Sequence, residues 1–184
     1  MKNKFNPRIK ARLRKNRQVL NKNIDNFFGW VKGAKLVELK ECNPEEDPVR
    51  PELDNKFRTG YGRKIFGVEY QGEIYAVMCF AYTNAIPKSV EELEKLSTDA
   101  FLQTAMRDQS GGQIAIAYTV WSKKKGGGKL IVKEVFKNIK KSNHLNRLVT
   151  LSPLTEMATN FHKRNGAKLI QINETTQNFE YKVM

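Results

Sequence analysis

The sequence has little cysteine, little histidine and no long apolar run, and each shortage excludes a class of protein. Its 184 residues include only Cys42 and Cys79 and two histidines. Two cysteines cannot form a disulfide framework, and neither has the paired spacing of a metal site, so we expect no metal and a reducing, cytoplasmic setting. The longest apolar run, residues 74–82, is too short to cross a bilayer and predicts a buried strand in a soluble protein.

Acidic side chains are also scarce, and the shortage is uneven along the chain. Lys and Arg number 33 against 19 Asp and Glu, which gives a formal net charge of +14. Residues 1–40 hold twelve of the basic side chains and only Asp25 and Glu38, so they contribute +10 of that charge. The remainder of the chain is therefore only mildly basic.

Residues 1–42 are predicted to form a basic, helical N-terminal arm. Residues 2–22 carry nine basic and no acidic side chains, with Ile9, Leu13 and Leu20 in loose helical spacing. Such a segment is either a solvated charged face or an arm that binds nucleic acid, membrane phosphate or an acidic partner protein, and the sequence leaves both interpretations open.

Beyond the arm we expect a connecting loop over residues 43–62, which contain three prolines, and then one domain over residues 63–184. Residues 64–70 and 73–80 flank Gln71-Gly72 and predict a β-hairpin. Later segments alternate between the hydrophobic spacing of helices and that of strands. The predicted helices are 89–96, 129–141 and 153–165, and the predicted strands are 114–121, 148–151, 168–173 and 178–183. The alternation predicts an α/β (α+β) fold with a mixed sheet flanked by helices.

The most informative stretch joins the strand 114–121 to the helix 129–141 through a basic glycine loop. Glycines let a backbone approach a ligand closely, and the free N–H groups and positive dipole end of the following helix favour a phosphate. Four lysines in this loop are either a solvated patch or part of that phosphate site. The candidate ligand-binding residues are Val120, Trp121, Ser122, Lys123, Lys124, Lys125, Gly126, Gly127, Gly128 and Lys129.

The pattern Lys123-x-x-Gly126-x-Gly128 resembles the pyrophosphate loop of the GNAT acetyltransferase superfamily. Ala158-x-x-Phe161-His162-x-x-x-Gly166 resembles a later helix of that superfamily, and the order of the elements agrees over residues 63–184. The resemblance implies a GNAT-like, mostly antiparallel sheet and a coenzyme A thioester, acetyl-CoA or malonyl-CoA, as the substrate. It also implies that His162 stands where the superfamily usually has a tyrosine that protonates the departing thiolate.

Three ordered blocks are similar to the C-terminal catalytic domain of malonyl-CoA decarboxylase, which is itself GNAT-folded. They are Leu148-Val149-Thr150-Leu151-Ser152-Pro153, Asn160-Phe161-His162-x-Arg164-Asn165-Gly166-Ala167, and Ile172-Asn173 with Asn178-Phe179-x-Tyr181. This resemblance implies that Ser152 and His162 are catalytic and that Tyr181 lies near the site. The chain departs from the family at Leu154-Thr155-Glu156, where a Pro-Gly-Phe type turn is usual and Glu156 places an acid near an anionic substrate.

Decarboxylation of a malonyl thioester requires such residues, since the enolate that remains must be stabilised and protonated at its α-carbon. A histidine with a near-neutral pKa supplies a proton, and a serine hydroxyl positions the carboxylate or relays a proton. Each residue also has a structural explanation. Ser152 before Pro153 fits a helix N-cap, His162 beside an apolar stripe fits a buried hydrogen-bonded histidine, and Tyr181 fits a core residue.

Three functions are consistent with these patterns. The first is a malonyl-CoA decarboxylase-like enzyme that uses Ser152 and His162. The second is an N-acetyltransferase acting on an amine, with Glu69 or Glu73 as base and His162 as acid. The third is a GNAT-like binding or structural module without catalysis, which the basic arm attaches to nucleic acid or a larger assembly.

Overall fold

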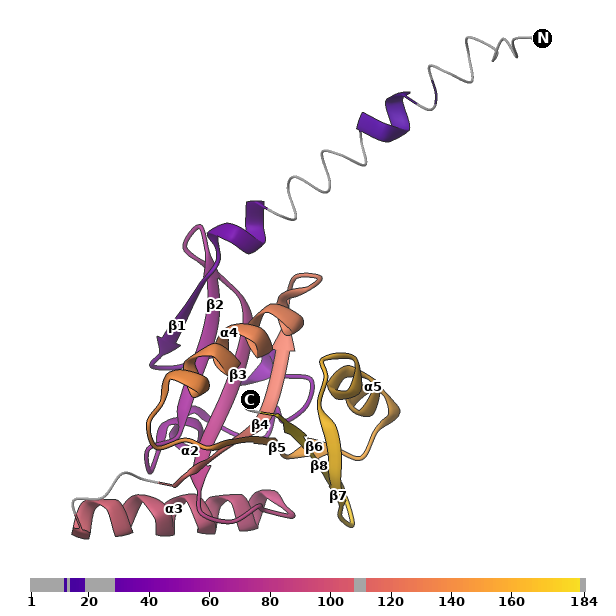
Figure 1. The fold of residues 1–184 in the computed structure, drawn as a ribbon. Helices are drawn as coiled ribbons and strands as arrows, with labels where there is room; N and C mark the ends of the chain where they lie inside the picture. The colour runs from indigo at the N-terminus through magenta and orange to yellow at the C-terminus, as the bar shows by residue number, and fades with distance from the viewer. Residues whose placement is uncertain (1–11, 13, 19–28, 108–111, 183–184) are drawn as a thin grey trace. The chain divides into compact units, whose positions relative to one another are not determined.

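The structure is a computed structural model and describes residues 12, 14–18, 29–107 and 112–182. By its internal contacts the chain divides into two units, residues 1–34 and residues 35–184, and the fold described below is that of the second (Figure 1). Residues 14–18 are helical and exposed. The other predictions for the first 28 residues, including the apolar spacing of Ile9, Leu13 and Leu20, lie outside the described residues.

Residues 35–182 are built on one mixed sheet in the order β1-β2-β3-β4-β5-β8-β6, with β7 paired to β8. Every pairing is antiparallel except that of β4 with β5, which is parallel. This arrangement confirms the predicted α/β fold. The strands are β1 Lys35–Leu39, β2 Lys64–Tyr70, β3 Glu73–Thr83, β4 Ile114–Ser122, β5 Arg147–Thr150, β6 Ser152–Pro153, β7 Lys168–Ile172 and β8 Thr176–Tyr181.

The predicted hairpin is confirmed at β2 and β3. Gln71 and Gly72 both have positive φ, 54° and 82°, as a two-residue type I′ turn requires. The apolar run 74–82 lies within β3 and is largely buried. Across the described residues, none of the helices combines the length and the apolar character that a membrane span requires.

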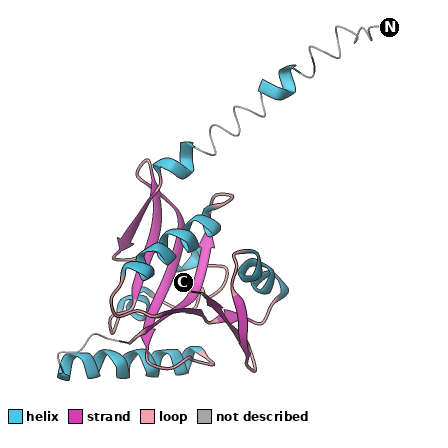
Figure 2. Ribbon diagram, in the orientation of Figure 1, coloured by secondary structure: helices cyan, strands magenta, loops and turns pink. Residues whose placement is uncertain are grey.

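The sheet is covered by helices α3 (Val90–Arg107) and α4 (Gly127–Lys141) on its two faces. Successive β3 side chains point to opposite faces, so Val77 and Cys79 join the core cluster that contains Leu93 of α3, whereas Phe80 lines a small pocket together with Val135 of α4. Figure 2 shows α4 crossing in front of the strands. The helix expected over residues 89–96 does begin after Ser89, whose hydroxyl accepts from the Glu92 N–H, but it continues to Arg107.

Two boundaries drawn from the sequence were wrong. Residues 35–39, which we placed in the arm, form β1 and pair with β2. The connecting loop at 43–62 contains a 3₁₀ turn, Pro44–Glu46, and helix α2, Asn55–Thr59. It belongs to the domain because Leu53 packs into the core and because three of its charged residues, Asp47, Arg50 and Arg58, are buried with internal partners.

The sheet opens between β4 and β5. The two strands pair from Ile114 to Ala117, and the Leu151 N–H makes a last bond to the Ala117 carbonyl at 2.9 Å. A bulge at this level inserts Tyr118 into β4 opposite β3, and the chain after Leu151 turns away to pair β6 with β8. Within the part of the chain that the structure describes, the second half of β4 thereby keeps its pairing with β3 but has no strand on the side that faced β5.

Candidate functional site

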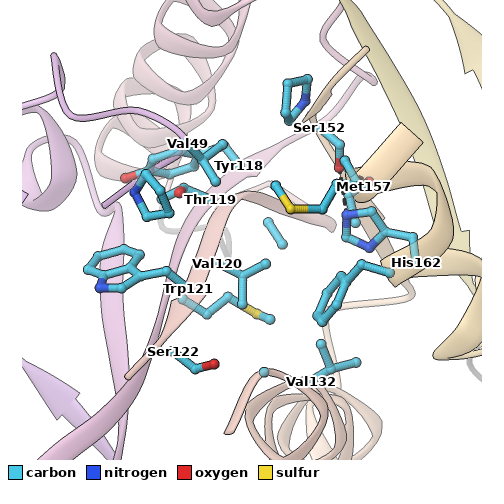
Figure 3. Close-up of a pocket in the computed structure, with 18 of the residues that line it drawn as sticks. Val49, Tyr118, Thr119, Val120, Trp121, Ser122, Val132, Ser152, Met157 and His162 are labelled. Atoms are coloured by element: carbon cyan, nitrogen blue, oxygen red, sulfur yellow. Dashed lines mark hydrogen bonds between the residues drawn. The ribbon is translucent and has the colours of Figure 1, made fainter. Parts of the chain in front are cut away.

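A cavity of about 330 Å³ fills the opening between β4 and β5. Most of its lining residues come from five parts of the chain: the second half of β4, the first turns of α4, the β5–β6 junction, helix α5 (Glu156–Arg164) and the segment before α2. Met78 of β3 and Tyr181 of β8 complete the lining. Figure 3 shows Val120, Met157 and Val132 facing one another across it, with Ser152 and His162 at one side. Most lining side chains are apolar, so a ligand that enters the cavity is transferred from water to a largely apolar environment.

The glycine loop brings the N-terminus of α4 to this cavity. Gly126 has φ 88° and precedes the first residue of the helix. A Cβ on Gly127 would lie 3.0 Å from the Cβ of Ser122, and one on Gly128 would lie 3.1 Å from the Phe161 ring. The glycines therefore let α4 pack closely against β4 and α5, and they leave first-turn N–H groups without preceding helical carbonyls.

Five of the ten predicted ligand-binding residues line the cavity: Val120, Trp121, Ser122, Lys123 and Gly128. Two of the loop lysines have protein partners. Lys123 forms an ion pair with Glu46 at 2.6 Å, and the Lys124 ammonium lies 4.6 Å from the centre of the Tyr75 ring. These contacts hold the start of the loop, while Lys123, Lys125 and Lys129 remain exposed.

The structure brings Ser152, His162 and Tyr181 together, although they come from three elements. The Ser152 Oγ lies 2.7 Å from the His162 Nε2, and the His162 Nδ1 lies 2.9 Å from the Tyr181 hydroxyl. Ser152 also hydrogen-bonds the Thr150 Oγ1 at 3.1 Å. All three predicted catalytic residues are more than nine-tenths buried, and Ser152 and His162 line the cavity together with Tyr181.

The expected N-cap role of Ser152 is wrong. Ser152 lies in β6, which pairs with β8, and α5 begins four residues later. The N-cap of α5 is Thr155, whose hydroxyl accepts a hydrogen bond from the Ala158 N–H. The Ser152 hydroxyl is consequently left for His162.

Burial changes the pKa values of this group. Desolvation lowers the pKa of His162 to about 4 and raises that of Tyr181. The ring of His162 stacks on Phe179 at 5.0 Å and meets Phe161 edge-on at 5.1 Å, which explains the loss of water. The near-neutral pKa that we expected for His162 is therefore wrong, and the imidazole is neutral at pH 7.

A neutral imidazole between two hydroxyls conducts a proton without carrying a charge. With the hydrogen on Nδ1 it donates to Tyr181 and accepts from Ser152, and with the hydrogen on Nε2 both bonds reverse. The arrangement can accept a proton at one end while it releases one at the other. It can also present the Ser152 hydroxyl to an oxygen or carbon atom held in the cavity.

The acids considered from the sequence are elsewhere. Glu69 and Glu73 do not line the cavity, and Glu73 accepts a bond from the exposed Tyr75 hydroxyl. Glu156 is exposed and outside the lining. Within residues 29–107 and 112–182, no cluster of three His, Cys, Asp or Glu side chains is suited to hold a metal ion.

Sequence reasoning missed the wall supplied by residues 46–49. Pro48 and Val49 line the cavity, and Asp47 is buried behind them. The prolines and charges of this segment predicted a loop that connects the arm to the domain, and no local pattern indicates that Asp47 is buried with internal partners. Met157 lines the opposite wall and is three-quarters exposed.

Structural comparison identifies the architecture. The GNAT-like decarboxylase GphF in complex with isobutyryl-CoA superposes with a TM-score of 0.63 at 9% identity, over 82% of this chain and 100% of that one. The loading GNATL domain of CurA from Lyngbya majuscula superposes with a TM-score of 0.57 at 13% identity, over 82% and 98%. No protein-family model matches the sequence, and neither does any curated protein.

A malonyl-CoA decarboxylase from Cupriavidus metallidurans also matches, at 18% identity and a TM-score of 0.49. This chain covers 37% of its length, and the superposition is too loose to bear on the narrower resemblance. The two better superpositions and the sheet order agree with the fold that the glycine loop indicated. The chain therefore has a GNAT-like fold.

Proposed function

We propose that the protein binds an acyl-CoA thioester in the cavity between β4 and β5 and decarboxylates a malonyl-type acyl group. The observation that carries the proposal is the Ser152–His162–Tyr181 chain at 2.7 and 2.9 Å, on the wall of a cavity whose other wall begins at the α4 N-terminus. The fold shared with GphF, which is described with an acyl-CoA bound, supports the ligand class.

The two ends of the cavity suit the two ends of such a molecule. The first-turn N–H groups of α4 and the flanking lysines favour the pyrophosphate. Between the ends, the unpaired edge of β4 offers backbone groups to the amides of an extended pantetheine arm, as a sheet edge does to an added strand. The thioester then lies near Ser152.

The reaction loses CO2 from the malonyl group, leaves an enolate and returns one proton to the α-carbon. An apolar cavity removes water from the carboxylate, so the charge that spreads over the enolate is favoured relative to the localised one. The Ser152 hydroxyl stabilises the developing charge and gives its proton to the α-carbon, the neutral His162 returns a proton to Ser152, and Tyr181 returns one to His162. Tyr181 recovers its proton from solvent, which supplies the one proton that each turnover consumes. No amine takes part in this step.

Mass spectrometry with malonyl-CoA tests the proposal. The protein is incubated with malonyl-CoA alone, with acetyl-CoA alone, and with acetyl-CoA plus a mixture of primary amines, while calorimetry measures CoA binding. We expect CoA binding and conversion of malonyl-CoA to acetyl-CoA without an amine. Binding without conversion would contradict the decarboxylase assignment, acetyl transfer that requires the amine would establish the acetyltransferase instead, and absence of binding would refute the ligand class.

A further inference from the structure

Arg50 joins the two strands at the point where they part. Its Nε donates to the Tyr118 carbonyl at 2.9 Å, and its Nη2 donates to the Leu151 carbonyl at 3.1 Å. Tyr118 is the bulged residue of β4, and Leu151 is the residue that leaves β5 for β6. One buried guanidinium, 8% exposed, thus replaces the ladder bonds that end at this level.

A second buried group holds the same segment to β4. Both Asp47 carboxylate oxygens accept from the Thr119 hydroxyl at 2.9 Å. The carboxylate also accepts a hydrogen bond from the backbone N–H of Arg50 at 3.2 Å and forms an ion pair with the Arg58 guanidinium at 2.9 Å. The backbone of Arg50 is therefore fixed by hydrogen bonds to its N–H and to its carbonyl, and this fixes the point from which the guanidinium extends.

The residues between these two anchors form a wall of the cavity. Pro48 and Val49 line it, whereas Asp47 and Arg50 turn their side chains into the protein. Figure 3 shows Val49 beside Tyr118 and Thr119, across the cavity from His162. The segment therefore couples the spacing of the two strands to the shape of the acyl end.

We propose that Arg50 is a positioning residue that fixes the separation of β4 from the β5–β6 junction and so places the acyl thioester against Ser152. This inference rests on the proposed function for its consequence in turnover, while the separation itself is a property of the fold. The guanidinium is suited to the task because its planar fork binds two acceptors in one fixed geometry, which a lysine cannot do. A shift of about 1 Å in a reacting group costs about 100-fold in rate.

The test compares Arg50→Met with Arg63→Met. Arg63 is also buried, at 4% exposed, and it donates to the Phe57 carbonyl and the Ser97 hydroxyl, away from the cavity lining. Both variants lose a buried guanidinium and leave acceptors unpaired, so both are expected to lower the melting temperature. Only Arg50→Met is expected to open the strands.

Hydrogen exchange at the Leu151 amide measures that opening without a substrate. This N–H makes the last bond between the two strands, so its exchange is expected to be about tenfold faster in Arg50→Met than in Arg63→Met. In turnover, Arg50→Met is expected to lose about 100-fold in kcat with the Kd for CoA within about twofold, and Arg63→Met to retain kcat. If Arg50→Met does not fold, Arg50→Lys replaces it, with the same direction of change.

The outcomes separate the two proposals. Equal exchange at Leu151 in the Arg50 and Arg63 variants overturns the positioning role, whatever the turnover. Faster exchange in a protein whose wild type does not convert malonyl-CoA supports the strand separation and refutes only the decarboxylase function. Faster exchange with an unchanged kcat in an active enzyme overturns the link between the separation and the acyl group.

Discussion

The two ends of the cavity are built in different ways. The end proposed to bind the anion comes from one continuous stretch, the end of β4, the glycine loop and the start of α4. The end proposed to hold the acyl group is assembled from β6, α5, β8 and the segment 46–50, which are far apart in sequence. The first end depends on local backbone geometry, and the second depends on packing that desolvates a histidine. Ligand affinity and turnover should therefore respond to different substitutions.

The largest expected effect is on turnover at the acyl end. Ser152→Ala removes the hydroxyl that His162 contacts, and kcat for malonyl-CoA is expected to fall about 1000-fold. The Kd for CoA, measured by calorimetry, is expected to stay within about twofold. Ser97→Ala is the matched control, since Ser97 is equally buried and hydrogen-bonded but bonds Arg63 outside the cavity. A Ser152→Ala variant with wild-type turnover would remove the serine from the mechanism.

Next in size is the pH dependence of stability. Because burial lowers the pKa of His162 from 6.5 to about 4, the unfolded chain binds a proton between these values and the folded protein does not. Stability is therefore fully present above pH 6.5 and falls as the pH drops to 4, by about 3 kcal/mol for this group. Urea unfolding at several pH values measures it.

His162→Gln is expected to flatten that part of the pH profile. The matched control is His144→Gln, which changes the other histidine of the chain at an exposed position. The control should leave the profile as in the wild type. A steep profile that survives in His162→Gln would place the responsible group elsewhere.

Affinity is expected to change by about tenfold at the anion-binding end. Gly126→Ala forces a Cβ onto a residue at φ 88°, which costs about 1 kcal/mol and disturbs the loop that presents the α4 N-terminus. Gly166→Ala has a similar φ of 86° at the end of α5, with open space around the new Cβ. Both variants should lose similar stability in thermal unfolding, but only Gly126→Ala should raise the Kd for CoA. Equal Kd values for Gly126→Ala and Gly166→Ala would show that the glycine loop does not bind CoA.

The smallest effect is expected at the mouth of the cavity. Lys123→Met removes a half-exposed lysine paired with Glu46, and the Kd for CoA is expected to rise about threefold at low salt, since exposed charges contribute little. Lys64→Met removes the comparable exposed pair between Lys64 of β2 and Glu38 of β1, and it should leave the Kd unchanged. Both should change the stability by less than about 0.5 kcal/mol. If Lys64→Met weakens binding as much, the effect is one of net charge.

Much of the fold could be predicted because its signals are local. Gln71-Gly72 predicted the hairpin, and the apolar stripe after Gly128 predicted α4, since both patterns depend on neighbours in sequence. The extent of α3 could not be predicted, because Ser97, Thr98 and Asp99 are weak helix formers that favour caps and turns, yet the helix continues through them to Arg107. The membership of residues 35–39 in the sheet was missed for a similar reason, as five residues of short alternation are a weak signal beside a basic arm.

The candidate site divides in the same way. The glycine loop could be recognised because spacing alone specifies it, and the blocks around Ser152, His162 and Tyr181 resembled a known family. The sequence could not predict the order in which these three residues are hydrogen-bonded, the lowered pKa of His162 or the capping of α5 by Thr155, because each depends on the folded structure. The burial of a side chain depends on many residues that are distant in sequence, so no single segment of the sequence predicts it.

By itself, the sequence determined most of the longer elements from β2 onward and the loop at which an anion is expected, because turn chemistry and periodicity act over a few residues. Only the tertiary structure decided that a proline-rich, charged segment would enter the domain and place Arg50 between two parting strands. Its guanidinium reaches carbonyls 68 and 101 residues away, and such contacts exist only once the chain is folded. The opening between β4 and β5 is thus a property of the whole domain.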